Sequence, residues 1–277
     1  MKHPPIARYA VKETRICLKH YAKNLRRAAK HPEDAEAIHD LRVSIRRVTQ
    51  SMRAFRGLLD PAPLRKFRER VHELMDLCAG VRNCDVALDL LQQVGITADA
   101  KVQKTRKDAA QRLLKRLKKE CGRHRVDVGF NTVPAEGAWE LDQSIEDNLR
   151  RILPGLADEF FAAGRAAISE EASYQTLHKF RLQTKRFRYT LDLFERSYGA
   201  QMARGAKILK ELQDRLGAIN DCATTIDLLK RDRRAVAALS KLLGQRRATL
   251  LTYARGRFTA ESLAWWKKWL SRPFLRP

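Results

Sequence analysis

The chain has 277 residues, of which 44% are hydrophobic, and its 56 Lys and Arg outnumber 32 Asp and Glu to give a formal net charge of +24. This composition supports a sizeable core in one large domain or two ordinary ones, excludes a disordered basic tail, and favours polyanionic partners. No apolar run approaches the roughly 18 residues that span a bilayer, and the N-terminus lacks the apolar stretch of a secretion signal, so the cytoplasm is the expected compartment.

In the first half of the chain, apolar residues recur with the helical period, and Pro or Gly residues mark the breaks. The pattern predicts helices over about 6–30, 39–60, 63–79 and 98–123, with a further short helix after Asn83. Asn83 is interpreted as the N-cap of that short helix. Residues 127–137 gather non-helical residues and form the predicted connection between two halves.

The second half repeats this organisation. The pattern predicts helices over about 138–153, 155–169, 178–199, 201–216, 222–229 and 233–256. Asn220 or Asp221 is the expected N-cap of the short helix that begins at Cys222. No segment alternates convincingly as a strand, so the predicted fold class is all-α.

A histidine-containing helix occurs twice. HDLRVSIRRVTQSMRAFRGLLD begins at His39, and HKFRLQTKRFRYTLDLFERSYG begins at His178. Aligning the histidines pairs His39 with His178, Arg42 with Arg181, Arg46 with Lys185 and Arg47 with Arg186. The later segments LCAGVRNCDVALDLL and RLGAINDCATTIDLL match at the same spacing to within one residue. The repeat predicts two halves built on one helical plan.

One side of the first histidine helix carries only positive charge. At about 100° per residue, His39, Arg42, Arg46 and Arg53 fall within roughly 60° of each other, opposite the apolar seam. Between Leu41 and Leu59 there are five arginines and no carboxylate. A face that is merely solvated usually mixes signs, so the single sign favours a site for an anion over simple solvation. In the second copy, Asp192 stands where the first has Arg53, which makes that face less basic.

The paired helices resemble the signature helices of CHAD domains, the conserved histidine α-helical domains, and GVRNCDVALDLL and LGAINDCATTIDLL are similar to the corresponding family stretches. The resemblance runs from about Ile6 into the 250s. It implies one domain over 6–256, made of repeats at about 6–126 and 137–256, and leaves a Trp-rich segment at 257–277. It also implies two four-helix-like halves related by a pseudo-twofold axis, with a basic cavity between them that binds inorganic polyphosphate without catalysis.

Carried over position by position, the resemblance assigns phosphate contact to His39, Arg42, Arg46, His178, Arg181 and Lys185. Further candidates on these or other helices are Arg47, Arg53, Arg186, Arg188, Arg8, Lys12, Arg15, Lys19, Lys207 and Lys210. Arginine forks hold two phosphate oxygens at once, and lysine supplies a flexible point charge. A phosphate beside a histidine favours the protonated imidazole. For the stripe from Arg8 to Lys19, solvation is an equally good interpretation.

Two other functions remain open. Nucleic acid is the main alternative ligand because its phosphates would be attracted by the same charge, although the aromatic residues lie mostly in the apolar seams. A phosphohydrolase is the weaker alternative: adjacent helix residues such as His39 and Asp40 point about 100° apart and cannot form a metal site alone. The predicted partners are polyphosphate or phosphate and sulfate ions. No catalytic residue, metal or cofactor is predicted.

The C-terminal sequence SLAWWKKWLSRPFLRP gathers Trp265, Trp266 and Trp269 around two lysines. Tryptophans four residues apart form an apolar stripe, which favours a terminal helix packed on the rest of the fold. The alternative is an amphipathic segment that docks on a granule surface, a membrane or a second subunit.

Overall fold

The computed structural model describes residues 5–97, 100–123, 128–129, 139–169, 171–198 and 201–271. The regular structure of these residues is α-helical, without a β-strand, which confirms the predicted class. The chain divides into two compact units, Met1–Gly137 with Thr224–Leu239, and Ala138–Ala223 with Ser240–Pro277. The predicted connection at 127–137 lies outside the described residues except for Val128 and Gly129. The pseudo-twofold relation and the shared basic cavity stay predictions.

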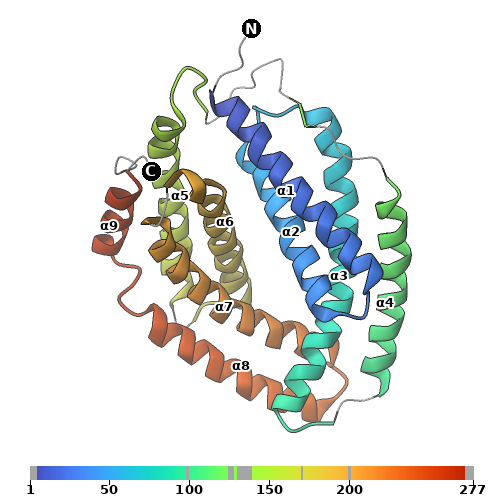
Figure 1. The fold of residues 1–277 in the computed structure, drawn as a ribbon. Helices are drawn as coiled ribbons and strands as arrows, with labels where there is room; N and C mark the ends of the chain where they lie inside the picture. The colour runs from blue at the N-terminus through green and yellow to red at the C-terminus, as the bar shows by residue number, and fades with distance from the viewer. Residues whose placement is uncertain are drawn as a thin grey trace. The chain divides into compact units, whose positions relative to one another are not determined.

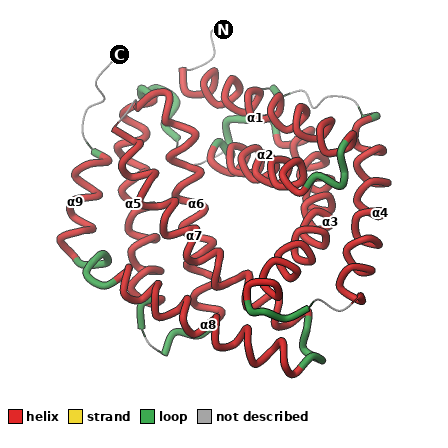
Figure 2. The backbone as a smooth tube through the Cα atoms, turned by 60° about the horizontal axis from the view of Figure 1, so that its bottom comes forward, coloured by secondary structure: helices red, strands yellow, loops and turns green. Residues whose placement is uncertain are grey.

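The first unit is built from α1 (Pro5–Lys30), α2 (Ala35–Ala54), α3 (Pro61–Gln93) and α4 (Ala100–Cys121). Helix α1 packs against α2 and α4, and α3 packs against the same two helices. Figures 1 and 2 both show α1 beside α2 and α3 beside α4. Each of the four helices therefore buries its apolar side against two neighbours, as in a four-helix bundle.

Capping residues and apolar side chains explain why these helices begin and pack where they do. Asp34 accepts a hydrogen bond from the Glu36 backbone N at 2.8 Å at the start of α2. Asp60 does the same for Ala62 at 2.9 Å, directly before the proline that opens α3. Both are standard helix starts. Inside the bundle, the core side chains from α2, α3 and α4 include the fully buried Leu41, Leu74 and Leu113.

The first unit also buries an ionic network. The Glu120 side chain is only 3% exposed, and its oxygens lie 3.2 Å from both Arg70 Nε and Arg116 Nη1. Arg116 Nη2 reaches Glu73, which is 63% exposed, at 3.0 Å. The Tyr21 hydroxyl is buried close by, and its burial raises the pKa of the phenol. Glu120 is therefore the buried carboxylate that compensates Arg116.

The second unit contains α5 (Ile145–Ala167), α6 (Tyr174–Tyr198) and α9 (Ala260–Leu270). Helices α7 (Gln201–Leu228) and α8 (Arg233–Ala254) supply residues to both units. Helix α5 packs against α6 and α9, as Figure 1 also shows. The core is aromatic: the Phe160 ring lies 5.7 Å from that of Phe180, 5.3 Å from that of Phe187 and 5.5 Å from that of Phe258.

Two of the predicted helix breaks are absent. Asn83 lies inside α3 and Asn220 lies inside α7, so the interpretation of either residue as an N-cap is wrong, and Asp221 is equally internal. Apolar neighbours on both helices, such as Cys84 and Cys222, are buried in the cores. Burial on both sides of the polar residue keeps the helix continuous, because packing outweighs the local capping preference.

A third predicted break, at Pro154, is also wrong. Helix α5 continues through this proline, with Leu153 before it and Ala157 after it both fully buried. The packing of these two side chains offsets the hydrogen bond that the proline cannot donate. The helix starts at Ile145 instead of near 138, because Ser144 accepts a hydrogen bond from the Asp147 backbone N at 3.0 Å. The missed continuity at Asn83, Pro154 and Asn220 has one cause, namely that core contacts are not visible in local sequence, whereas the start of α5 is set by a local cap.

The terminal tryptophans belong to α9. Trp266 is buried, with its ring 5.5 Å from that of Phe187 on α6, which confirms the packing interpretation for this residue. A Cβ atom at Gly205 on α7 would come within 2.7 Å of Trp269, so this glycine allows a close approach of α9. Trp265 remains 41% exposed. Within the described residues, no helix combines the length and the apolar composition needed to cross a membrane.

Candidate anion-binding clusters

Four basic side chains from two helices define the His39 cluster: His39, Arg42 and Arg46 on α2, and Arg82 on α3. Partial burial lowers the pKa of His39, and the Arg82 and Arg46 guanidiniums lower it further. Arg42 adds a smaller effect in the same direction, and only Asp40 opposes it. The imidazole thus lies in a positive field, which an anion would neutralise.

The acidic residues around the start of α2 contact Arg27, an arginine outside the His39 cluster. Arg27 at the end of α1 pairs with Asp40 at 2.8 Å through Nη1 and with Asp34 at 3.1 Å through Nη2. Glu36 lies 3.8 Å from the same guanidinium. These three carboxylates therefore gather around Arg27, which is not part of the His39 cluster.

Arg82 is the functional candidate that the sequence reasoning missed. The signal was present, because the aligned segments after Leu77 and Arg215 set Arg82 opposite Asn220. Its role was hidden by the prediction of a helix break at Asn83, which would have separated Arg82 from the continuous helix that carries it. Since α3 is one helix from Pro61 to Gln93 and packs against α2, Arg82 belongs to a helix that neighbours the His39 helix.

The second unit has a counterpart, the His178 cluster, made of His178, Arg181 and Lys185 on α6 with Asn220 on α7. The Asn220 Oδ1 atom lies 3.4 Å from His178 Nδ1 and accepts a hydrogen bond from the Tyr174 hydroxyl at 3.2 Å. Arg181 and Lys185 are half-buried on the same helix. Asn220 thus lies beside His178 at the position that matches Arg82 in the repeat.

Two of the other candidates on α6 bind protein groups. Arg186 forms an ion pair with Glu159 on α5. Arg188 Nε donates to Gln213 Oε1 on α7 at 2.9 Å, and its Nη1 lies 3.5 Å from Asp192. The equivalent of Arg186 in the first copy, Arg47, is exposed, as is Arg53. Their contacts with phosphate stay predictions.

The remaining candidates lie at the surface of their units. The α1 stripe of Arg8, Lys12, Arg15 and Lys19 is exposed, and Arg15 Nη2 donates to the Val128 carbonyl oxygen at 2.9 Å. Lys207 and Lys210 are exposed on α7. A role of these side chains in phosphate binding likewise stays a prediction. Among the described residues, no group of three or more His, Cys, Asp or Glu side chains is arranged to hold a metal ion.

The model of the CHAD domain family matches residues 14–230. This chain belongs to the CHAD domain family. The match includes both histidine helices and the long helices that bring Arg82 and Asn220 to them, so the two clusters are part of the CHAD region.

Solved structures agree on the fold. The CHAD chain is similar to the crystal structure of the CHAD domain from the plant Ricinus communis, with 21% identity, a TM-score of 0.57, and coverage of 97% of this chain and 92% of that one. It is also similar to PptA from Streptomyces chartreusis, with 17% identity, a TM-score of 0.53, and coverage of 93% and 98%. At these identities the likeness shows the fold alone. Among curated proteins, no match was found.

Proposed function

We propose that this CHAD protein binds inorganic polyphosphate through the His39 and His178 clusters and acts as a binding module without catalytic activity. The observation that carries the proposal is the His39 cluster, in which Arg82, Arg46 and Arg42 act on one imidazole. The acid next to that histidine, Asp40, is paired with Arg27. Membership of the CHAD family supports the same ligand.

The chemistry of the cluster suits a linear phosphate polymer. Such a chain carries about one negative charge per phosphate and presents no base or sugar, so its receptor needs only positive charge and hydrogen-bond donors. Guanidiniums supply both, and remain charged at any physiological pH. A polymer also meets several cations at once, so its affinity should rise with chain length and fall steeply with salt.

The direct test measures the binding of polyphosphates of graded length to the wild type and to the double variant Arg42→Ala with Arg181→Ala. We expect the variant to lose about a hundredfold in affinity, since each arginine supplies charge-assisted hydrogen bonds. The matched control is Arg65→Ala with Arg255→Ala, which removes one exposed arginine from each unit outside the clusters. Equal losses in the two double variants would show that only net charge matters and would contradict the proposal.

Competition separates polyphosphate from nucleic acid. Polyphosphate should displace a bound DNA or RNA duplex when both are supplied at equal phosphate concentration, because most side chains of the clusters are cations that bind phosphate groups. Displacement in the opposite direction would favour a nucleic-acid-binding protein. Release of inorganic phosphate from polyphosphate in the presence of divalent metals would contradict the non-catalytic part of the proposal.

The location in cells provides a further test. A fluorescent fusion of the wild type should collect at cytoplasmic polyphosphate granules, where the ligand is concentrated, while the Arg42→Ala, Arg181→Ala variant should remain diffuse. A wild-type fusion that does not collect at the granules would contradict this location.

A further inference from the structure

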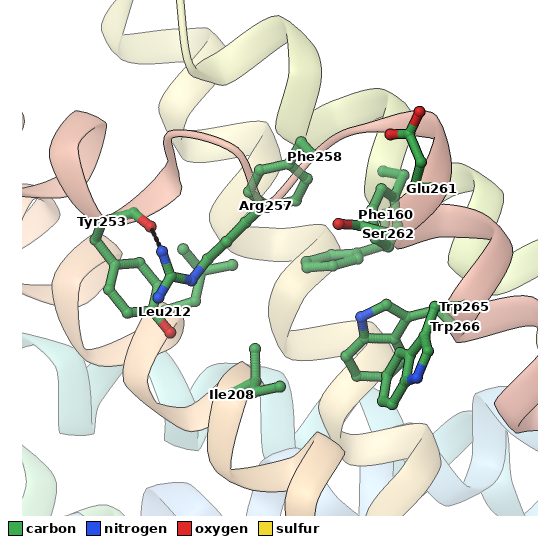
Figure 3. A pocket seen from close by; sticks show the side chains of 11 residues that line it. Phe160, Ile208, Leu212, Tyr253, Arg257, Phe258, Glu261, Ser262, Trp265 and Trp266 are labelled. Carbon is green, nitrogen blue, oxygen red and sulfur yellow. Dashed lines mark hydrogen bonds between the residues drawn. The ribbon is translucent and has the colours of Figure 1, made fainter.

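A separate cavity lies in the second unit, between α5, α7, α8 and α9. Its volume is about 510 Å³, and its apolar wall includes Phe160, Phe161, Leu212, Phe258, Trp265 and Trp266. Figure 3 shows the tryptophan indoles on one side of the cavity and Tyr253 with Leu212 on the other. The described residues that line it include none from α6, so the cavity is distinct from the His178 cluster.

One cation is built into this apolar wall. The Arg257 guanidinium lies over the Tyr253 ring at 4.2 Å and donates a hydrogen bond to the Tyr253 carbonyl oxygen. Figure 3 shows its side chain extending from the turn before α9 across to Tyr253. Stacking and hydrogen bonding thus hold the guanidinium at the cavity, and within the described part of the chain it makes no ion pair with a carboxylate.

Two acidic residues lie at or near the cavity, and one of them, Glu261, is among the residues that line it. The Tyr253 hydroxyl donates to Glu211 at 3.1 Å. Glu261 belongs to the first turn of α9, where hydrogen bonds from its own backbone and from Thr259 lower the pKa of its carboxyl. A second guanidinium, that of Arg215, lies 4.0 Å from the centre of the Tyr253 ring. Two guanidiniums therefore lie at the Tyr253 ring against the single carboxylate of Glu211. The carboxylate of Glu261 lines the cavity at the start of α9, the helix that carries the tryptophans.

We propose that this cavity binds a small amphipathic organic anion, with its acidic group at Arg257 and its apolar body against the phenylalanines and tryptophans. The volume of about 510 Å³ lies in the range that encloses a small organic ligand and is too small for a polymer or a folded partner. The aromatic wall selects an aliphatic or aromatic body, and the guanidinium fork matches a carboxylate or sulfonate. This site goes beyond polyphosphate binding and does not depend on it.

The test uses decanoate as the probe, below its micellar concentration, and decanol as the neutral match with the same apolar body. Binding is followed by tryptophan fluorescence, since Trp265 and Trp266 line the cavity, and by calorimetry on the full chain. We expect saturable binding of decanoate and none of acetate, which lacks the apolar body. Absence of saturable decanoate binding by the wild type would overturn the proposal.

Variants locate the anion and the apolar body. Arg257→Gln should weaken decanoate binding by about fivefold or more and leave decanol unaffected, because only the charged contact is lost. Arg255→Gln removes another exposed arginine, outside the cavity wall, and should not change the affinity for either ligand. Trp265→Ala should weaken the binding of both ligands. Because the Trp265 side chain is 41% exposed, we expect this variant to fold, and circular dichroism would verify it.

Other outcomes overturn the proposal in distinct ways. Equal losses of decanoate affinity in Arg255→Gln and Arg257→Gln would mean that binding depends only on the net charge of the protein. Sedimentation tests for a second copy of the chain. If the wild type does not bind decanoate but self-associates, and Trp265→Ala does not self-associate, a second copy covers the cavity and the proposal is wrong. Polyphosphate affinity should be the same in Arg257→Gln as in Arg255→Gln, so failure here is distinguishable from failure of the polyphosphate proposal.

Discussion

The Arg82 guanidinium of α3 acts electrostatically on His39 of α2 and, after partial burial, helps most to hold the pKa of that imidazole below its ordinary value. At the matching position of the repeat, Asn220 places its Oδ1 atom 3.4 Å from His178 Nδ1. Each histidine thus neighbours a long helix, α3 in the first copy and α7 in the second, which presents a cation in the first copy and a neutral amide in the second. The difference makes the contribution of Arg82 measurable.

Polyphosphate binding should take up a proton at His39. The pKa of this residue in the empty protein is below 6.5, and phosphate oxygens would raise it, so affinity should increase as the pH falls from about 8 to about 5.5. Calorimetry in two buffers with different ionisation enthalpies measures the uptake directly. The His39→Gln variant should take up fewer protons than the wild type; an unchanged uptake would contradict this role.

Without ligand, the same lowered pKa makes His39 a source of acid instability. The unfolded chain binds the proton more readily than the folded one, so stability falls as the pH drops below the ordinary value of 6.5 and down through the lowered pKa. Urea unfolding at about pH 7.5 and about pH 5.5 should show a smaller loss for His39→Gln than for the wild type. Identical losses of unfolding free energy in the two proteins would mean that titratable groups other than His39 cause the acid sensitivity.

Exchange of the matched residues should exchange their electrostatic effects. Arg82→Asn removes a positive neighbour, so the pKa of His39 should rise and polyphosphate affinity should fall by about tenfold. Asn220→Arg should strengthen polyphosphate binding because it adds a cation beside His178. NMR titration of the imidazole Cε1 protons and a binding curve on each variant test both statements. A pKa of His39 that is unmoved in Arg82→Asn would refute the electrostatic effect of Arg82 on this imidazole.

Removal of the buried carboxylate in the first unit should be costly. Glu120→Gln leaves the 9% exposed Arg116 side chain without its buried counter-ion and should lower the free energy of unfolding by about 3 kcal/mol. Glu73→Gln removes a carboxylate from the same arginine, but Glu73 is 63% exposed, so we expect less than about 1 kcal/mol. Urea denaturation of both variants checks the contrast, and equal costs would mean that burial does not decide it.

Two glycines of α5 should respond to alanine in opposite ways. A Cβ atom at Gly164 would come within 2.2 Å of the Phe258 ring, so Gly164→Ala must displace this core side chain and should cost about 2 kcal/mol. Nothing lies within 4 Å of a Cβ at Gly155, so Gly155→Ala should stabilise the helix by about 0.5 kcal/mol. Thermal unfolding compares them; a neutral Gly164→Ala would show that Phe258 moves at little cost.

Much of the architecture could be predicted because helical periodicity is a local property. The spacing of apolar residues located the helices that the structure shows as α1, α2, α4, α6 and α8, and the repeated histidine motif identified the two clusters' main side chains. The prediction failed at Asn83, Pro154 and Asn220, where a polar residue or a proline lies within a continuous helix. At these positions the local preference opposes the tertiary packing, and packing prevails.

The sequence by itself determined the all-α class, the positive charge and the single-sign face of the His39 helix, because these follow from composition and from the angle between successive residues. Only the tertiary structure decided which charges meet. In the folded chain Arg186 pairs with Glu159, and Asp34 and Asp40 both pair with Arg27. Arg82 acts electrostatically on His39. The reason is distance: Coulomb interactions and hydrogen bonds act between side chains that are neighbours in space, and helices far apart in sequence become neighbours only when their apolar faces pack.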